Sequence, residues 1–188
     1  MQLRQFLSRR LKVMSRKNLY EFLSSEVSAL PEKSRILNVG AGGEVERVVR
    51  RSLPDGCNLT TLDIDKKRRH DVLADITEVS FDNEFDAVVM AEVLEHVRKP
   101  HVAIDRVYAA LKSNGKLIIT APFVFPLHDR PHDYFRFTKY GLRYLLSDFC
   151  DVKIMERNGW YEALYVLRVR LLLEQDVPRL HKLLFSVA

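Results

Sequence analysis

The stretch that decides the fold is residues 35–44, which read RILNVGAGGE. Its apolar first half predicts a short buried strand over residues 36–39. Three glycines in four positions then predict a turn with almost no side chains, and helical apolar spacing follows at Val45, Val48 and Val49. A strand, glycine turn and helix can cradle a nucleotide cofactor, because bare backbone admits a ligand and a helix N-terminus offers free N–H groups. A tight turn without a ligand would show the same glycines.

The composition is that of an ordinary globular protein. The 188 residues are 47% hydrophobic and 29% charged, with a formal net charge of +5, which suits one domain with a substantial core. Cys57 and Cys150 are too few for a disulfide framework and lack metal-ligand spacing, so we predict a cytoplasmic protein and no metal site. No run of about 18 apolar residues occurs. The nearest approach, residues 163–173, is interrupted by Arg168 and Arg170.

Strand and helix patterns alternate along the middle of the chain. Further strands are predicted over residues 58–63, 71–75, 85–90 and 116–120, with a helix from Pro100 to a helix-ending Gly115 and another helix capped by Thr138. This alternation predicts an α/β fold with a mainly parallel sheet and helices on both faces. A sixth strand is predicted over residues 152–155. Residues 160–173 then indicate either a strand followed by a helix or one apolar helix, which suggests an abbreviated C-terminus.

We interpret the chain as one domain, residues 1–188, with a helical N-terminal segment (1–30), a core (34–150) and a C-terminal strand and helix region (151–188). The first twenty residues carry six basic and no acidic side chains, with apolar residues near one helical face. This segment, or the apolar C-terminal one after Pro178, is a candidate for peripheral membrane contact. For the N-terminal segment, the alternatives are a docking helix with a solvated face and a transit peptide.

In their order, the core segments resemble the class I S-adenosylmethionine-dependent methyltransferases, most of all the type-11 (UbiE-like) group. The resemblance rests on residues 36–42 (ILNVGAG), 61–65 (TLDID), 73–76 (LADI), 85–97 (FDAVVMAEVLEHV) and 111–117 (LKSNGKL). It implies a Rossmann-like fold with S-adenosyl-L-methionine as cofactor. The positions that it assigns to the cofactor are Asn38, Gly40, Ala41, Gly42, Asp63, Ile64, Asp75, Ile76, Ala91, Glu92 and His96. The chain departs from the family pattern at Asn38, where an acid is common, and at Glu44, the third glycine position.

The acidic residues at the strand ends have a chemical reason of their own. Asp63 stands 23 residues after Gly40, where a βαβ unit places the acid that binds ribose hydroxyls. A solvated turn acid is the alternative for Asp63, and Asp65 is its rival in register. Asp75 can accept from an adenine amino group with Ile76 against the ring, or it can cap a turn. His96 either lines the cofactor cleft or is a structural histidine.

Residues 121–138, APFVFPLHDRPHDYFRFT, follow the fifth predicted strand at the edge where ligands of α/β sheets bind. The segment is too long and too patterned for a plain connector. We predict that it closes over a methyl acceptor, with the catalytic candidates His128, His132 and Asp133 moving or holding protons. The candidates for acceptor binding are Tyr134 and Arg136. The alternative is a rigid lid whose histidines and aspartates cap turns.

Together these features predict a methyltransferase that acts on a small-molecule or glycan/lipid-linked acceptor, with no nucleic-acid partner. Two other functions remain open. Asn38 and the abbreviated C-terminus are compatible with a non-catalytic methyltransferase-like binding module. An NAD(P)-dependent oxidoreductase is less favoured, because Val45 occupies the third glycine position of G-x-G-x-x-G.

Overall fold

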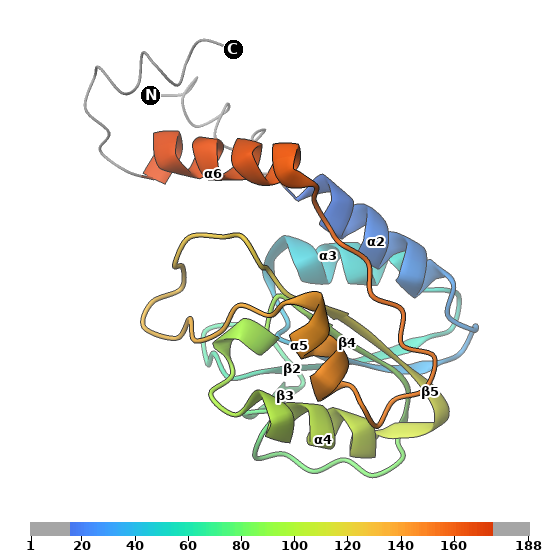
Figure 1. Ribbon diagram of the computed structural model, residues 1–188. Helices are drawn as coiled ribbons and strands as arrows, with labels where there is room; N and C mark the ends of the chain where they lie inside the picture. Colours follow the sequence, from blue (N-terminus) through green and yellow to red (C-terminus); the bar gives the residue numbers. More distant parts are fainter. Residues whose placement is uncertain (1–15, 175–188) are drawn as a thin grey trace.

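The computed structural model describes residues 16–174, and a parallel β-sheet forms its centre (Figure 1). The strands are β1 (Arg35–Val39), β2 (Asn58–Asp63), β3 (Val72–Leu73), β4 (Phe85–Ala91) and β5 (Leu111–Thr120). They lie in the order β3-β2-β1-β4-β5, and every neighbouring pair runs parallel. The connections therefore diverge between β1 and β4, the point where open α/β sheets bind ligands at the carboxyl ends of their strands. The predicted α/β fold is confirmed.

Helices cover both faces of this sheet (Figure 1). The elements are α2 (Lys17–Ser28) and α3 (Gly43–Ser52) on one face, α4 (Pro100–Ala110) and α5 (Lys139–Leu145) on the other, a 3-10 helix η1 (Leu94–His96), and α6 (Trp160–Glu174). Successive side chains of β1 point to opposite faces of the sheet, as strand geometry requires. Ile36 packs with the cluster of α2 and α3, and Leu37 and Val39 pack with that of α4. An uninterrupted apolar run therefore gives a strand that is buried on both sides.

Two local predictions are confirmed in the helices. The apolar spacing before Pro31 places Leu19, Leu23 and Val27 on the inner face of α2, where each is at most 1% exposed. Thr138 caps α5, and its side-chain oxygen accepts a hydrogen bond from the Gly141 N–H at 3.0 Å. A side-chain oxygen at this position satisfies one of the N–H groups that the first helical turn leaves without a partner.

Two local predictions are wrong. Residues 152–155 form no strand, so the sheet within the described residues ends at β5. Val152 and Ile154 are partly buried and alternate with exposed residues, so the burial pattern of a strand is present without backbone pairing. Gly115 does not end the preceding helix, which stops at Ala110. The left-handed conformation falls one residue earlier, at Asn114 with φ of +64°, inside the segment that leads into β5.

The C-terminal alternative is settled in favour of one helix, since α6 runs from Trp160 to Glu174 and extends beyond the end of α2 (Figure 1). Most of the predicted basic N-terminal helix, residues 1–15, lies outside the described residues, as does the final segment around Pro178. No helix within residues 16–174 is long and apolar enough to cross a bilayer.

The packing of α2 against the sheet gives a first prediction. Leu23 is fully buried, so Leu23→Ala leaves a cavity and should lower the free energy of unfolding by about 2–5 kcal/mol. Leu164→Ala is the matched control, because Leu164 is 61% exposed on another helix, and its effect should stay within about 0.5 kcal/mol. Urea denaturation measures both values. Equal effects in the two variants would contradict the assignment of α2 to the core.

Candidate functional site

The glycine turn lies directly against the end of β4. Gly40 follows β1 with φ of +76°, a left-handed conformation that suits glycine. Its N–H and that of Ala41 donate to the Leu62 carbonyl at 2.8 and 3.2 Å, which fastens the turn to β2. A Cβ atom on Gly40 would overlap the Cγ2 atom of Val93. The missing side chain therefore allows the exits of β1 and β4 to meet.

A buried carboxylate stands beside this turn, at the end of β2. Asp63 is 5% exposed. Its Oδ1 atom accepts from the Asp65 N–H at 2.8 Å, and its Oδ2 atom accepts from Arg68 Nη1 at 3.1 Å. The same guanidinium nitrogen donates to the Ala41 carbonyl at 3.3 Å, so the Arg68 side chain lies across the turn. A ligand hydroxyl that binds Asp63 Oδ2 would replace Arg68 there.

The other predicted cofactor residues of β1–β3 differ in what they offer. Asn38 is 1% exposed, and its amide nitrogen has no hydrogen-bond partner among the described residues. Asp75 accepts from the N–H and hydroxyl of Thr77 at 2.8 and 2.9 Å, so it caps a turn. Ile76 is buried in the core, which leaves little of its side chain for a ring, whereas Ile64 is 65% exposed. Their contacts with a cofactor remain predictions.

The exit of β4 carries a strained acidic residue. Glu92 has φ of +56°, in a region that residues other than glycine rarely adopt. Its carboxylate accepts from the Thr120 hydroxyl at 3.1 Å and pairs with Arg157 Nη1 at 2.9 Å. Such conformations persist where the surroundings enforce them, and they cluster at functional sites. Glu92 thereby links β4, β5 and the segment before α6 at the carboxyl edge of the sheet.

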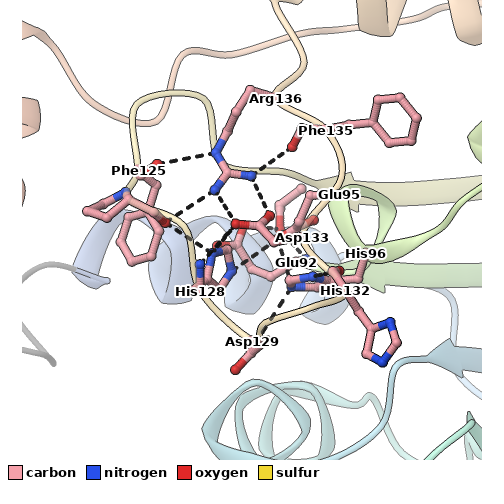
Figure 2. Close-up of polar contacts among 12 residues, drawn as sticks. Glu92, Glu95, His96, Phe125, His128, Asp129, His132, Asp133, Phe135 and Arg136 are labelled. Carbon is pink, nitrogen blue, oxygen red and sulfur yellow. Dashed lines mark hydrogen bonds and ion pairs between the residues drawn. The ribbon is translucent and has the colours of Figure 1, made fainter.

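The loop of residues 121–138 is held together by one ion pair (Figure 2). Arg136 donates to both carboxylate oxygens of Asp133 at 2.6 Å and to the backbone carbonyls of Phe125, Pro126 and Phe135. These hydrogen bonds hold the pKa of the Asp133 carboxyl well below its usual range. Because all five N–H donors of Arg136 are used, its predicted contact with an acceptor would require one of these bonds to break.

The loop docks on η1 through backbone hydrogen bonds. The N–H groups of Tyr134 and Phe135 donate to the Glu95 carbonyl at 2.9 and 3.2 Å. The Tyr134 hydroxyl accepts from Arg98 Nε at 2.9 Å and lies 2.9 Å from His132 Nδ1. His132 is exposed, and its ring lies away from the cluster of Glu95, His96 and His128 (Figure 2). The structure thus separates His132 from the other predicted catalytic residues.

Glu95, His96 and His128 converge where the loop meets η1 (Figure 2). The Glu95 side chain is fully buried, and neither of its carboxylate oxygens has a hydrogen-bond partner within residues 16–174. Burial, with the nearby charge of Glu92, raises the pKa of the Glu95 carboxyl to about 8. The rings of His96 and His128 meet edge to face, with centroids 4.8 Å apart. We call these three residues the Glu95 cluster.

A cleft of about 130 Å³ joins the glycine turn to this cluster. Five of the predicted cofactor residues line it, namely Gly40, Gly42, Ala91, Glu92 and His96, and so do Arg68, Phe125, His128, Asp129 and Arg157. Arg68, Glu95 and Arg157 were not predicted as site residues from the sequence. Arg68 and Arg157 carry no motif that distinguishes them from surface arginines. Glu95 lies within the predicted motif of residues 85–97, but only the packing shows that its carboxylate is buried.

The comparisons agree with this geometry. The profile of a methyltransferase domain family matches residues 6–161. The chain therefore belongs to this family, and the class I S-adenosylmethionine-dependent methyltransferase assignment is confirmed. Among curated proteins, none matches.

Three solved structures illustrate the shared fold. A candidate methyltransferase from Bacillus halodurans is 17% identical, with 66% of this chain and 65% of that chain covered and a TM-score of 0.54. A SAM-dependent methyltransferase from Aquifex aeolicus is 16% identical, with 75% and 86% covered and a TM-score of 0.55. Phosphoethanolamine N-methyltransferase 2 from Haemonchus contortus is 18% identical, with 91% and 45% covered and a TM-score of 0.62. This chain thus spans about two thirds of the first protein and under half of the third.

The contact between Gly40 and Val93 gives a second prediction. Gly40→Ala should lower the free energy of unfolding by about 2–5 kcal/mol, the sum of left-handed strain and overpacking. Gly43→Ala is the matched control: Gly43 has φ of +64°, but no atom lies within 4 Å of its added Cβ, so only the strain of about 1–2 kcal/mol should appear. Urea denaturation compares the two variants. Equal losses would show that the meeting of β1 and β4 does not require the bare Gly40 backbone.

Proposed function

We propose that this chain transfers a methyl group from S-adenosyl-L-methionine to an acceptor held beneath the loop of residues 121–138. One observation carries the proposal: a single cleft is lined at one end by the glycine turn and at the other by two histidines of the Glu95 cluster. The cofactor supplies an electrophilic methyl group on a sulfonium. Methyl transfer then depends mainly on placing the acceptor in line, which can be worth effective molarities of roughly 10⁵–10⁸ M.

The residues at the glycine turn fit this cofactor. Gly40 and Gly42 line the cleft, and Asp63 is buried at the end of β2, where a ribose binds in such folds. Arg68 has to move for Asp63 to accept from ribose hydroxyls. Its side chain is 51% exposed, so this movement needs no change in the core. The orphaned amide nitrogen of Asn38 supplies a further donor close behind the turn.

The acceptor end combines apolar and acid-base groups. Phe123, Val124 and Leu127 are 41–64% exposed and lie close together in the sequence of the loop. They support an acceptor with an apolar portion, either a small molecule or a glycan/lipid-linked one. His128 of the same loop lines the cleft, with its Nδ1 atom 3.2 Å from Asp133 Oδ2. The imidazole is thereby oriented with Nε2 inward.

The non-catalytic alternative is weaker on the same grounds. A binding module has no need for a buried carboxylate and two histidines on a cleft, and such groups are costly to bury. The oxidoreductase alternative finds no support, since the family match and the solved structures cited above indicate methyltransferases.

Cofactor binding tests the first half of the proposal. Asp63→Ala should weaken the binding of S-adenosylhomocysteine about 10- to 150-fold, because a hydrogen bond to a charged group contributes about 1.5–3 kcal/mol. Asp65→Ala is the matched control: its carboxylate is 43% exposed in the same turn, and its affinity should stay close to that of the wild type. Isothermal titration calorimetry measures both. Unchanged affinity in Asp63→Ala would reject the ribose assignment.

Methyl transfer tests the second half. The chain is incubated with an extract and S-adenosylmethionine labelled in its methyl group, and products are identified by mass spectrometry. His128→Ala should slow labelling about 10²- to 10⁴-fold while cofactor affinity is retained. His101→Ala is the control, since His101 is exposed on α4 and should label at the wild-type rate. Equal labelling by both variants would remove His128 from the reaction.

A further inference from the structure

The hydrogen bonds of the two histidines in the Glu95 cluster fix where their protons lie. His96 Nδ1 is 2.7 Å from the carbonyl oxygen of His132, which can only accept. His128 Nδ1 lies 3.2 Å from the ionised Asp133 carboxylate and 3.3 Å from the Pro126 carbonyl, which also only accept. Each Nδ1 atom therefore carries a proton, and the Nε2 atom of each ring faces the Glu95 carboxyl group.

Three potential metal-ligand atoms consequently face one another. His96 Nε2 lies 3.7 Å from Glu95 Oε1, and His128 Nε2 lies 4.0 Å from the same oxygen. These distances exceed those of a hydrogen bond. At these positions, neither ring is therefore hydrogen-bonded to the Glu95 carboxyl group. The buried Glu95 carboxyl group has no hydrogen-bond partner among the described residues, and a cation bound between it and the two rings would supply the missing polar contact.

The distances suit a shared cation. Bonds of about 2.0–2.1 Å to a tetrahedral cation place neighbouring ligand atoms roughly 3.3 Å apart. The three donor atoms of the cluster already lie within 4.8 Å of one another, so side-chain shifts of roughly 1 Å would complete the set. Asp129 Oδ2 lies 3.8 Å from His96 Nε2 on an exposed side chain and is a candidate fourth ligand. An acceptor oxygen or water entering from the cleft is the alternative.

The groups around His96 and His128 resemble those that orient the ligands of a metal site. Ligating histidines almost always donate their other N–H to a carboxylate or a backbone carbonyl. His128 Nδ1 does so to the Pro126 carbonyl and lies 3.2 Å from Asp133, which Arg136 holds from behind, and His96 Nδ1 does so to the His132 carbonyl. These contacts fix both ring orientations before any ion arrives.

We propose that Glu95, His96 and His128 bind a divalent transition-metal cation. Two imidazoles and one carboxylate suit Zn²⁺, Mn²⁺, Fe²⁺ or Co²⁺ better than Mg²⁺ or Ca²⁺, which prefer oxygen ligands. No sequence pattern indicates this site, since the cysteines lack metal spacing and the two histidines are 32 residues apart. The site is formed by the docking of the loop on η1.

This site also indicates that the acceptor group is a hydroxyl, an inference that rests on the proposed function. An acceptor O–H bound to the cation has a lowered pKa and releases its proton to solvent through the cleft. The oxygen then forms a bond to the methyl carbon as the carbon–sulfur bond breaks. The bonding electrons stay on sulfur, which leaves S-adenosylhomocysteine and a methyl ether.

Metal binding is measured without any substrate. The full chain is stripped with a chelator and titrated with ZnCl₂, CoCl₂ or MgCl₂ by calorimetry, with the visible absorption of Co²⁺ as a second readout. The wild type should bind one equivalent of Zn²⁺ or Co²⁺ more tightly than Mg²⁺. Glu95→Gln and His128→Gln should each weaken binding about tenfold or more. His101→Ala, an exposed histidine outside the cluster, should bind like the wild type.

Melting temperatures show whether a variant that fails to bind metal is still folded. Without metal, Glu95→Gln should melt close to the wild type, because the amide has the size of the buried carboxyl group that it replaces, whose oxygens have no hydrogen-bond partner among the described residues. With Zn²⁺, only the wild type and His101→Ala should gain stability. Absence of Zn²⁺ and Co²⁺ binding in the wild type, or equal binding in all variants, would overturn the site. Retained binding of S-adenosylhomocysteine in that case would leave the proposed function standing, whereas metal binding without cofactor binding would reject the proposed function alone.

Discussion

The close approach of β1 and β4 at their carboxyl ends is the constraint on which the site depends. Gly40 has no side chain, so Val93 occupies the space where a Cβ atom would lie. This contact brings the glycine turn next to the left-handed residue Glu92 and to η1. Because the loop after β5 docks on the Glu95 carbonyl, the acceptor side of the cleft is positioned by the same junction. A single packing contact between two strand exits therefore sets the distance between both halves of the site.

Much of the fold could be predicted because it follows from periodicity and from backbone limits. The apolar run at residues 36–39 predicts a strand that is buried on both faces, and Ile36 and Leu37 confirm it by packing on opposite sides. The glycines predict a bare turn for steric reasons that hold in any context. The predicted strand over residues 152–155 was wrong because it rested on alternating burial alone. Val152 and Ile154 have a strand's alternation, but alternation describes burial and does not require backbone pairing.

The site was less predictable, because its key features arise from contacts between distant parts of the chain. Asp63 could be named from its spacing, yet the arginine that pairs with it could not. Glu95 stands between Leu94 and His96 in a motif that looks ordinary. Its burial depends on a loop more than thirty residues later, whose docking no local pattern encodes. The predicted roles of His128 and His132 were equivalent in sequence, and only the fold separates a ring in the cleft from an exposed one.

The charged residues of the site form two groups, one at the cofactor end and one at the acceptor end. Asp63 and Arg68 form a pair at the cofactor end, on elements that also build the core. At the acceptor end, Asp133 is balanced by Arg136 and Glu92 by Arg157, and both arginines lie beyond β5. Glu95 has no such partner among the described residues. The acceptor end is therefore the part of the site where a bound cation, as proposed above, would satisfy a buried carboxyl group, whereas at the cofactor end Asp63 is already paired with its own arginine.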